Sequence, residues 1–349
     1  MKLQTRLISF LIGCMVLLTA CSVFPTEASP TQQITIGNEA DELIHLYFTS
    51  PADNSGCQLT VPVLQAIHEA QESIQIAMYN FNQEAVAEAL VAAQARGVRV
   101  NIVMDNDKRE NKVPSYLADS GIPMVYDPEE STMHNKFMII DRKQVWTGSM
   151  NFTRSGCEDD YNHMIQIFSR ELAANYQSEF DEMFVERSFS SASPANTPHP
   201  LINVAGVQIH TYFSPDDGVQ AALLKLIART QETIVFMAYS FTSDKLAEGL
   251  MDRAVQGVVV SGIMDADQIR SNTGGEYDRM RKAGISIAQD DISGQMHHKV
   301  LILDEKIVVL GSYNFSGNAE KRNDENVLIL YSPAIARYFL QEYAQIKTR

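Results

Sequence analysis

The sequence predicts an α/β protein made of two layered domains of the same fold, related by pseudo-twofold symmetry. In each half, helix patterns alternate with short apolar runs typical of buried strands. The second half repeats the first at a nearly constant offset, and a segment rich in Ser and Pro separates them. We expect domains over residues 43–187 and 207–349, a linker over 188–206, and in each domain a mixed, mostly parallel sheet flanked by helices.

The chain begins with the features of an export signal. Lys2 and Arg6 precede an apolar run over residues 7–18, which is too short for an ordinary membrane span. The following Leu-Thr-Ala-Cys string ends at Cys21 and resembles a bacterial lipobox, in which the cysteine is acylated. We therefore expect a signal peptide over residues 1–20, a lipid-anchored tether over 21–42, and an exported, membrane-anchored lipoprotein; a plain cleaved signal is the alternative.

Composition and charge favour some classes of partner over others. The chain is 45% hydrophobic and carries a formal charge of −15, which becomes −17 when the predicted signal peptide and its two cations are removed. An acidic protein lacks the long-range positive field that gathers polyanions. This disfavours a protein that scans nucleic acid, although a local basic groove on an acidic body stays possible.

Two cysteines, Cys57 and Cys157, remain in the predicted folded part. An exported chain meets an oxidising compartment, so a disulfide between them is one interpretation. Two separate thiols are the other, because spacing alone does not give the geometry.

The repeat can be followed element by element. Helices are predicted over residues 64–71 and 84–96 in the first half, and over 221–230 and 244–256 in the second. A glycine follows the second helix of each pair, where a helix stop is expected. The apolar runs over residues 74–81 and 98–105 return 160 residues later as predicted buried strands.

The strongest part of the repeat is a polar string on an apolar strand. His134, Lys136 and Asp141 return 163 residues later as His297, Lys299 and Asp304. Side chains alternate between the faces of a strand, so each His and Lys point to the same side. Each Asp lies where a turn is expected, which indicates a structural role. A Gly-Ser-x-Asn-Phe string follows each copy and supplies Ser149, Asn151, Ser312 and Asn314.

This set of side chains suits phosphodiester transfer at one site shared by the two domains. A Lys and an Asn from each half would surround the non-bridging oxygens and stabilise the charge of the transition state. One His would attack phosphorus and the other would protonate the leaving alkoxide. A zinc site is the competing interpretation of paired histidines, but Lys is a poor metal ligand and no carboxylate or Cys repeats at ligand spacing.

The two strings resemble the HKD motifs of the phospholipase D superfamily, and the resemblance covers nearly all of the mature chain. The individual repeats are most similar to the small bacterial endonucleases of that superfamily, in their Tyr-Phe-Ser-Pro and Tyr-x-Phe strings. The resemblance implies a covalent phosphohistidine intermediate and no metal or other cofactor. It also implies the catalytic set His134, Lys136, Asp141, His297, Lys299 and Asp304.

The family places a hydrogen-bonding partner for each motif histidine downstream, and here the two halves differ. Glu325 lies twenty-eight residues after His297, and Asn162 lies twenty-eight residues after His134. We expect each to pair with the histidine of its own half. A neighbouring carboxylate raises the pKa of an imidazole, so this pairing predicts His297 as the general acid and His134 as the nucleophile. Ser149, Asn151, Asn162, Ser312, Asn314 and Glu325 are the predicted substrate-binding and orienting residues.

Two further histidines, His163 and His298, have no counterpart in the other copy, where Asn326 and Asn135 stand. We interpret both as incidental to the site.

Three functions stay open from the sequence, and hydrolysis of a phospholipid head-group phosphodiester is the one we favour. Cleavage of single-stranded DNA or RNA is the alternative, and a non-catalytic binding module is the third. Six loop cations either line a groove for backbone phosphates or form a solvated rim: Lys108, Arg109, Lys112, Arg270, Lys321 and Arg322. The expected partners are the substrate and the membrane, with a monomer that contains an internal pseudo-dimer.

Overall fold

The computed structural model describes residues 34–39, 42–51, 57–128 and 132–348. These residues belong to one compact unit, Thr31–Arg349. Cys21 and the predicted signal peptide lie outside the described residues. Within the described ranges, no helix has the length and apolarity needed to cross a bilayer.

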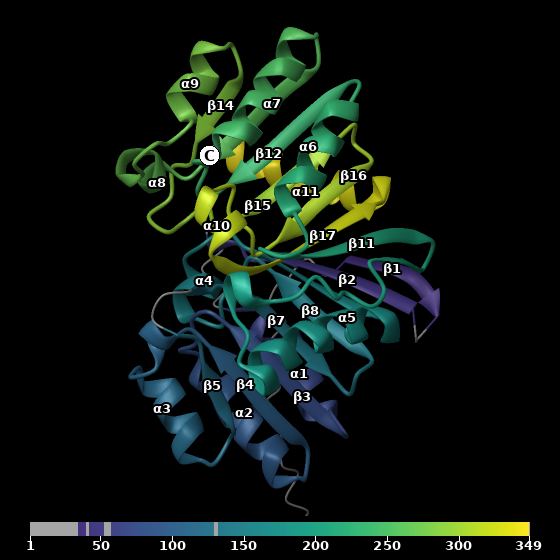
Figure 1. Ribbon diagram of the computed structural model, residues 1–349, viewed down its shortest axis with the longest axis vertical. Helices are drawn as coiled ribbons and strands as arrows, with labels where there is room; N and C mark the ends of the chain where they lie inside the picture. The colour runs from purple at the N-terminus through teal and green to yellow at the C-terminus, as the bar shows by residue number, and fades with distance from the viewer. Residues whose placement is uncertain (1–33, 40–41, 52–56, 129–131, 349) are drawn as a thin grey trace, which may run out of the picture. The chain divides into compact units, whose positions relative to one another are not determined.

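The first half contains a mixed sheet in the order β1-β2-β9-β8-β7-β3-β4-β5 (Figure 1). Its strands are β1 Ile34–Glu39, β2 Glu42–Phe48, β9 His163–Phe168, β8 Gln144–Gly148, β7 Lys136–Ile140, β3 Ser73–Met78, β4 Arg99–Met104 and β5 Met124–Tyr126. Strands β3, β4 and β5 run parallel to one another. The other neighbours are antiparallel.

The second half repeats this sheet in the order β10-β11-β17-β16-β15-β12-β13-β14. Its strands are β10 Leu201–Val204, β11 Val207–Ser214, β17 Asn323–Tyr331, β16 Ile307–Gly311, β15 Lys299–Leu303, β12 Thr233–Ala238, β13 Val259–Met264 and β14 Ser286–Gln289. Here β12, β13 and β14 are parallel and the remaining pairs are antiparallel. The equal order of strands confirms the predicted pair of pseudo-symmetric α/β halves.

The sheets are mixed, as predicted, but they are not mostly parallel. The motif strand β7 turns back into β8 through Asp141 and Arg142, both of which have φ of 52°. Two successive residues at positive φ are typical of a type I′ hairpin turn, which joins antiparallel strands. A short apolar run has the same appearance in a parallel and an antiparallel buried strand, so the sequence pattern did not separate them.

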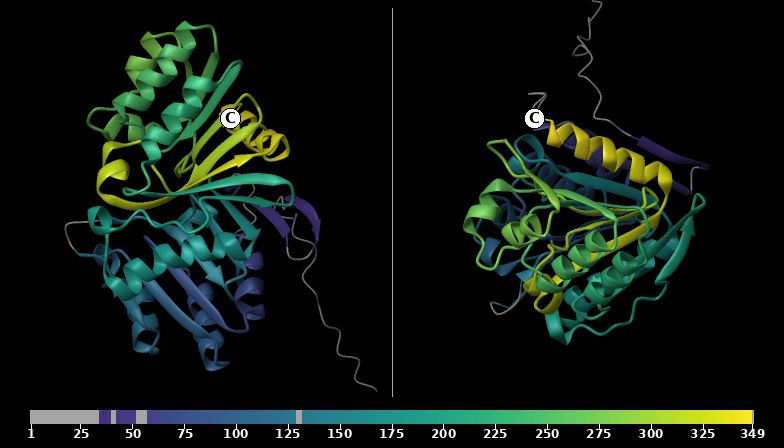
Figure 2. Two further views of the ribbon diagram at one scale, coloured as in Figure 1. Left: turned by 45° about the vertical axis from the view of Figure 1, so that its right-hand side comes forward. Right: turned by 90° about the horizontal axis from the view of Figure 1, so that it is seen from above.

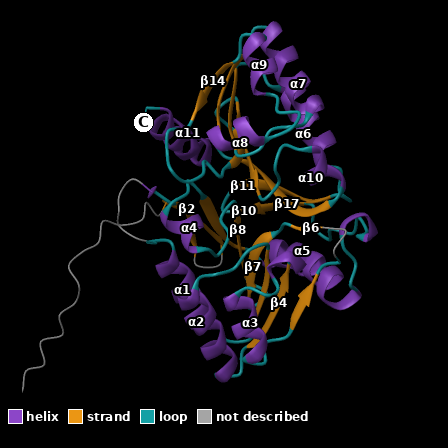
Figure 3. Ribbon diagram, turned by 90° about the vertical axis from the view of Figure 1, so that its left-hand side faces the viewer, coloured by secondary structure: helices purple, strands orange, loops and turns teal. Residues whose placement is uncertain are grey.

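Helices cover both faces of each sheet. In the first half they are α1 Thr60–Glu69, α2 Glu84–Ala95, α3 Lys112–Asp119, α4 Arg154–Glu158 and α5 Arg170–Asp181; in the second they are α6 Val219–Arg229, α7 Asp244–Val255, α8 Ala266–Ser271, α9 Tyr277–Lys282, α10 Gly317–Lys321 and α11 Pro333–Lys347. Shorter helical turns occur at Asn106–Lys108, Glu182–Glu186 and Ser190–Ala192. Helices α1 and α2 lie on one side of the first sheet and α5 on the other (Figure 3). The four predicted helices are confirmed as α1, α2, α6 and α7.

Two stretches predicted as connecting segments contain edge strands. β1 lies within the predicted tether, and β10 lies within the predicted linker. β10 forms a hairpin with β11 through Ala205 and Gly206, which have φ of 51° and 77°. The buried side chains of Ile202 and Val204 explain why this part of the linker is ordered.

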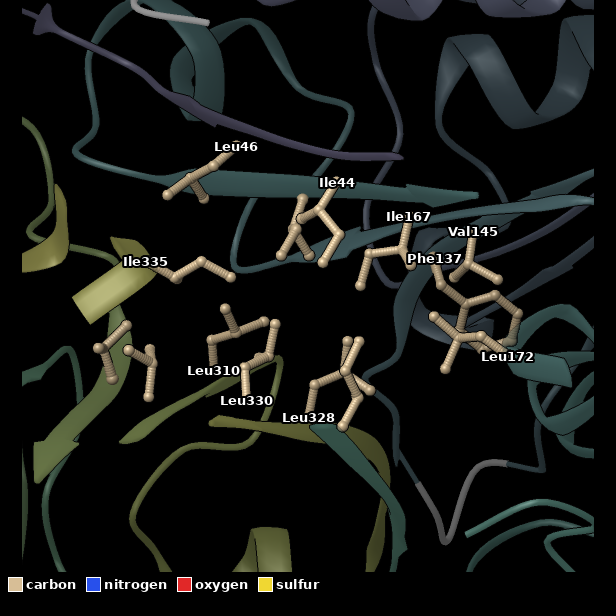
Figure 4. Close-up of a cluster of buried hydrophobic side chains, with 14 of the residues drawn as sticks. Ile44, Leu46, Phe137, Val145, Ile167, Leu172, Leu310, Leu328, Leu330 and Ile335 are labelled. Carbon is tan, nitrogen blue, oxygen red and sulfur yellow. The ribbon is translucent and has the colours of Figure 1, made fainter. Parts of the chain in front are cut away.

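One apolar cluster joins the two halves. Side chains of the first sheet, such as Ile44 and Ile167, face Leu328 and Leu330 of the second (Figure 4). The C-terminal helix α11 lies beside β2 of the first half (Figure 2), where the rings of Phe48 and Phe339 meet edge to face at 5.1 Å. Burial of this surface provides the main apolar stabilisation of the junction between the motif strands.

Candidate active site

The two motif histidines are held by backbone of the opposite half. β6 (Thr132–Met133), which precedes the first motif, pairs in parallel with the start of β17. The backbone N–H of His134 donates to the Asp324 carbonyl at 3.0 Å, and that of His297 donates to the Tyr161 carbonyl at 2.9 Å. The motif strands therefore begin at the junction of the halves, which brings both imidazoles to one site.

The side-chain partners of the histidines are exchanged relative to the prediction. His134 Nδ1 lies 2.7 Å from Glu325 Oε2, and His297 Nδ1 lies 2.9 Å from Asn162 Oδ1. The expectation that each partner would bind the histidine of its own half is wrong. Glu325 and Asn162 stay with their own halves but lie at the junction, directly after residues that pair with the opposite half, Asp324 with Met133 and Tyr161 with Met296, so each reaches the other motif. The carboxylate thus belongs to His134 and the amide to His297.

Burial controls the charge of both imidazoles. The His134 side chain is 12% exposed and that of His297 is more fully buried. Burial lowers the pKa of His134 to about 4; Glu325 opposes this shift and Lys136 adds to it. Burial followed by the charges of Lys299 and Lys136 holds the pKa of His297 well below its usual value. The negative charge of a bound phosphodiester would raise both pKa values, because it would compensate the same cations.

The two motif lysines are buried and stacked on tyrosine rings. Lys136 Nζ donates to the His134 carbonyl at 2.8 Å, and Lys299 Nζ donates to the His297 carbonyl at 2.7 Å. Each ammonium also lies over an aromatic ring, 5.1 Å from the centre of Tyr79 and 4.7 Å from that of Tyr239. Burial lowers the pKa of Lys136 to about 7 and that of Lys299 well below its usual value. An anion between these lysines would favour their charged forms.

The tyrosines are site residues that the sequence analysis did not assign. Tyr79 and Tyr239 follow β3 and β12 directly, and their rings lie 4.8 Å and 4.7 Å from those of His134 and His297. Their signal was present, since both stand in the repeated Tyr-x-Phe string at the end of an apolar strand. Nothing in that string, however, indicates contact with an imidazole more than fifty residues away.

The predicted serines position the backbone rather than a ligand. Ser149 Oγ donates to Asn162 Oδ1 at 2.8 Å and accepts the N–H of His163 at 3.1 Å. Ser312 Oγ likewise accepts the N–H of Asn326 at 3.0 Å, and both serines are fully buried. The expectation that they contact phosphate is therefore corrected. They fix the close approach of neighbouring strands beside the site.

The predicted asparagines retain unused hydrogen-bonding capacity. Asn151 Oδ1 and Asn314 Oδ1 are buried and have no hydrogen-bond partner within the described part of the chain. Buried polar atoms without partners are uncommon. Because an amide oxygen accepts and does not donate hydrogen bonds, these atoms cannot bind a phosphate oxygen, and contact of the two Asn side chains with phosphate stays a prediction.

Comparison with known proteins places this arrangement in a family. A family model described as "Cardiolipin synthase, PLD-like domain" matches residues 63–184 and 223–347, which together make up more than half of the chain. The chain belongs to the phospholipase D-like family. This confirms the resemblance predicted from the two motifs and identifies the chain as a phospholipase D-like phosphodiesterase.

Relatives cover one or both halves of this phospholipase D-like chain. A protein of Rickettsia prowazekii (strain Madrid E) named phospholipase D is 27% identical over 169 residues, which are 48% of this chain and 82% of the relative. A Mus musculus protein named mitochondrial cardiolipin hydrolase is 34% identical over 124 residues, or 36% of this chain and 56% of the relative. The crystal structure of phosphatidylserine synthase from Haemophilus influenzae Rd KW20 has a TM-score of 0.67 and 14% identity, and covers 91% of this chain and 88% of that one. This last similarity supports the two-halved fold.

Two of the six residues predicted as catalytic lie away from the site. The Asp141 carboxylate, at the far end of β7, accepts the backbone N–H groups of Glu72 and Ser73 at 2.7 Å and 3.0 Å. Asp304 binds Glu232 and Thr233 in the same way. Burial raises the pKa of Asp304, but these backbone donors outweigh it and lower the pKa below its usual value. The two aspartates of this phospholipase D-like chain therefore stabilise the turns in which they lie. This agrees with the structural role expected from their position, and the prediction that they are catalytic is wrong.

The two histidines interpreted as incidental form a buried pair between the halves. His163 Nδ1 and His298 Nδ1 lie 2.9 Å apart with stacked rings, and burial holds the pKa of His163 well below its usual value. The short contact requires one ring nitrogen to donate and the other to accept. At the pseudo-equivalent place, Asn326 Nδ2 donates to Asn135 Oδ1 at 2.9 Å. These residues pair across the junction, so they are structural but not incidental.

Cys57 and Cys157 are joined by a disulfide, with their Cα atoms 5.1 Å apart. The bond ties the segment before α1 to α4. Among the described residues, no group of three His, Cys, Asp or Glu side chains is placed to hold a metal ion.

Proposed function

We propose that this chain hydrolyses a phospholipid head-group phosphodiester through a covalent phosphohistidine, without a metal. The observation that carries the proposal is the meeting of His134 and His297 at one site, each with Nδ1 engaged by a side chain from the opposite half. With Nδ1 engaged, Nε2 of each ring is the nitrogen that can react.

In the proposed mechanism, His134 is the nucleophile. Its Nε2 attacks phosphorus while His297 gives a proton to the leaving head-group alkoxide. His297 then removes a proton from water, whose oxygen attacks phosphorus and breaks the P–N bond. The products are the free alcohol and phosphatidate.

The exchanged partners support these roles on different grounds from those of the sequence analysis. Phosphorylation of His134 Nε2 leaves a positive charge on the ring, which the Glu325 carboxylate compensates directly, as a buried acid stabilises an imidazolium in other nucleophilic sites. Asn162 gives His297 a fixed orientation without that compensation. A protonated His297 is therefore the stronger acid of the two, as the donor of a proton to the leaving group should be.

A lipid substrate is favoured over nucleic acid by the charges around the site. Of the six cations predicted to lie in loops, Lys112, Arg270 and Lys321 lie instead on α3, α8 and α10. Three of the six are salt-bridged: Lys112 to Glu84 at 2.5 Å, Arg109 to Glu110 at 3.8 Å, and Arg270 to Asp267. Paired cations contribute less to a field that attracts a polyanion. The names of the relatives, phospholipase D and mitochondrial cardiolipin hydrolase, support the same choice. We also propose that acylation of Cys21 anchors the exported chain at a membrane.

A direct comparison of substrates in EDTA tests this function. Full-length protein in detergent is assayed for choline release from phosphatidylcholine vesicles and for degradation of single-stranded DNA, beside a His134→Ala variant. We expect lipid turnover that persists in EDTA and is lost in the variant. Degradation of DNA without lipid turnover would refute the lipid assignment, and activity that survives in the variant would refute the mechanism.

A further inference from the structure

Each half contains a pocket between its first helix and its outer strands. In the second half a pocket of about 310 Å³ lies between α6, β11 and β17; its lining includes His210, Tyr212, Asp217, Lys225, Arg229 and Tyr331. In the first half a pocket of about 170 Å³ lies between α1, β2, β8 and β9; its lining includes His45, Tyr47, Gln65, Glu69 and Phe168. The two occupy equivalent places in the repeated fold.

Comparison of the two linings shows where they differ. The His and Tyr of β2 recur on β11, so these residues belong to the shared scaffold. Gln65 and Glu69 of α1 are replaced on α6 by Lys225 and Arg229, one helical turn apart on the same face. The phenyl ring of Phe168 is replaced by the phenol of Tyr331. At these three positions the second pocket has gained two cations and a hydroxyl in place of two neutral groups and a carboxylate. The first pocket is also lined by the amides of Gln144 and Gln166, and Ile329 lies at the place of Gln166 in the second.

The charges of the second pocket are available to a ligand. Neither Lys225 nor Arg229 forms a salt bridge with any residue that the structure describes. Asp217 also lines the pocket, but its Oδ2 already accepts the Phe213 N–H at 2.9 Å and the Thr197 hydroxyl at 2.8 Å. Counting ionised side chains, two cations and one anion give the second pocket a charge of +1, whereas Glu69 gives the first pocket −1. A net positive pocket stands out on a chain of charge −15.

The second pocket is separate from the catalytic site. Tyr331 and Glu325 lie on the same strand, β17, six residues apart. At about 3.3 Å per residue this corresponds to roughly 20 Å. A ligand of the size of this pocket would not reach the motif histidines.

We propose that this pocket is a second, non-catalytic site for a phosphate group bearing negative charge. The Arg229 guanidinium supplies a planar pair of donors and Lys225 a compact charge, the two complementary ways in which proteins hold phosphate. The hydroxyls of Tyr212 and Tyr331 provide further donors. The same chemistry suits a soluble phosphomonoester and the phosphate of an anionic lipid head group. The proposal does not depend on the substrate or mechanism of the catalytic site.

Histidine NMR can test the site without an activity measurement. Full-length protein with ¹³C-labelled histidine is titrated with inorganic phosphate at constant pH and ionic strength, with chloride as the control anion. A His134→Ala variant, in which lipid turnover is blocked, is titrated separately with phosphatidylglycerol nanodiscs. We expect the His210 signal to shift while His45, its counterpart in the first pocket, stays unchanged.

Matched variants make the result decisive. Lys225→Gln with Arg229→Glu copies the two helix residues of the first pocket into the second. We expect it to weaken phosphate binding, followed at His210, at least about tenfold while leaving the thermal unfolding curve unchanged, since both side chains are exposed. The reciprocal Gln65→Lys with Glu69→Arg should create a response at His45. A shift with inorganic phosphate identifies a site for soluble phosphate, and a shift with nanodiscs alone identifies a lipid site. Absence of both shifts, an equal shift of His45 in the unaltered chain, or a response that survives the charge exchange would overturn the proposal.

Discussion

Replacing Glu325 with Gln tests the proposed division of labour between the histidines. The substitution keeps the shape of a fully buried side chain and removes only its charge. It converts a 2.7 Å contact between His134 and a carboxylate into one with a neutral amide. A hydrogen bond to a charged group contributes about 1.5–3 kcal/mol. If that energy is realised when the imidazole becomes cationic, formation of the phosphohistidine should slow by roughly 10- to 150-fold.

The assay is single-turnover phosphorylation followed by rapid acid-free quenching and peptide mapping. We expect phosphate on His134 and slower phosphorylation in the Glu325→Gln variant. The carboxylate raises the pKa of His134, so its removal should lower that pKa further below about 4 and move the acidic limb of kcat/KM to lower pH. An Asn162→Gln variant, which changes the neutral partner of His297, is the control. Phosphate on His297, or a rate within twofold of the unaltered chain for Glu325→Gln, would refute the reasoning.

Three further predictions address stability and substrate choice. The Cys57–Cys157 disulfide closes a loop across a separation of 100 residues, so breaking it should reduce the free energy of unfolding by about 2–5 kcal/mol. Denaturant titration with and without reductant measures this change, and an unchanged midpoint would contradict the prediction. Gly311 has φ of 148°, and in Gly311→Ala the added methyl group would lie against the backbone carbonyl of Asn326 on the facing strand. The substitution should reduce the free energy of unfolding by about 1–3 kcal/mol and lower the melting temperature. An unchanged melting temperature would show that the two strands can move apart to accommodate the methyl group. Lys108, whose ammonium lies 5.1 Å from the Tyr79 ring centre beside the site, has Gln268 as its counterpart, and we predict that it contacts the second phosphate of a lipid that carries two. Lys108→Gln should therefore lower kcat/KM for cardiolipin vesicles by about fivefold more than for phosphatidylcholine. Equal losses on both lipids would count against this contact.

Much of the fold could be predicted because its signals are local. The spacing of apolar residues set the helices, and α1 differs from its prediction only by an earlier start at Thr60 and an earlier end at Glu69. Gly97 and Gly257 have φ of 94° and 93°, the left-handed conformation in which a helix commonly ends. Strand direction was not local information. The chain reverses through Asp141 and Arg142, and the Asp141 carboxylate fixes this turn by accepting from the backbone of Glu72 and Ser73, 69 and 68 positions earlier. Only the folded structure shows these contacts.

The identity of the site residues could be predicted more fully than the contacts between them. Repetition identified the histidines and lysines because both copies kept them in register. The partners of the histidines were assigned to the wrong half, because a spacing of twenty-eight residues does not show which of the two histidines the partner contacts. Ser149 and Ser312 were misassigned for a related reason, since a hydroxyl near a site serves a strand contact as readily as a ligand. In each case the residue was correct and the contact was decided by tertiary structure.

The exchange of histidine partners across the junction explains how a duplicated chain can build an unequal site. With two identical halves, both histidines would meet the same partner, and neither would be set apart as nucleophile or acid before substrate binds. Here residue 325 belongs to one copy while the imidazole that it contacts belongs to the other, so one change in the second half alters the first motif alone. The asparagine at the matching position leaves the second motif with a neutral partner. In a fused chain, a single substitution outside the two motifs can therefore give the two histidines different partners. The repeated strings stay intact, so the motifs themselves do not reveal that the histidines differ.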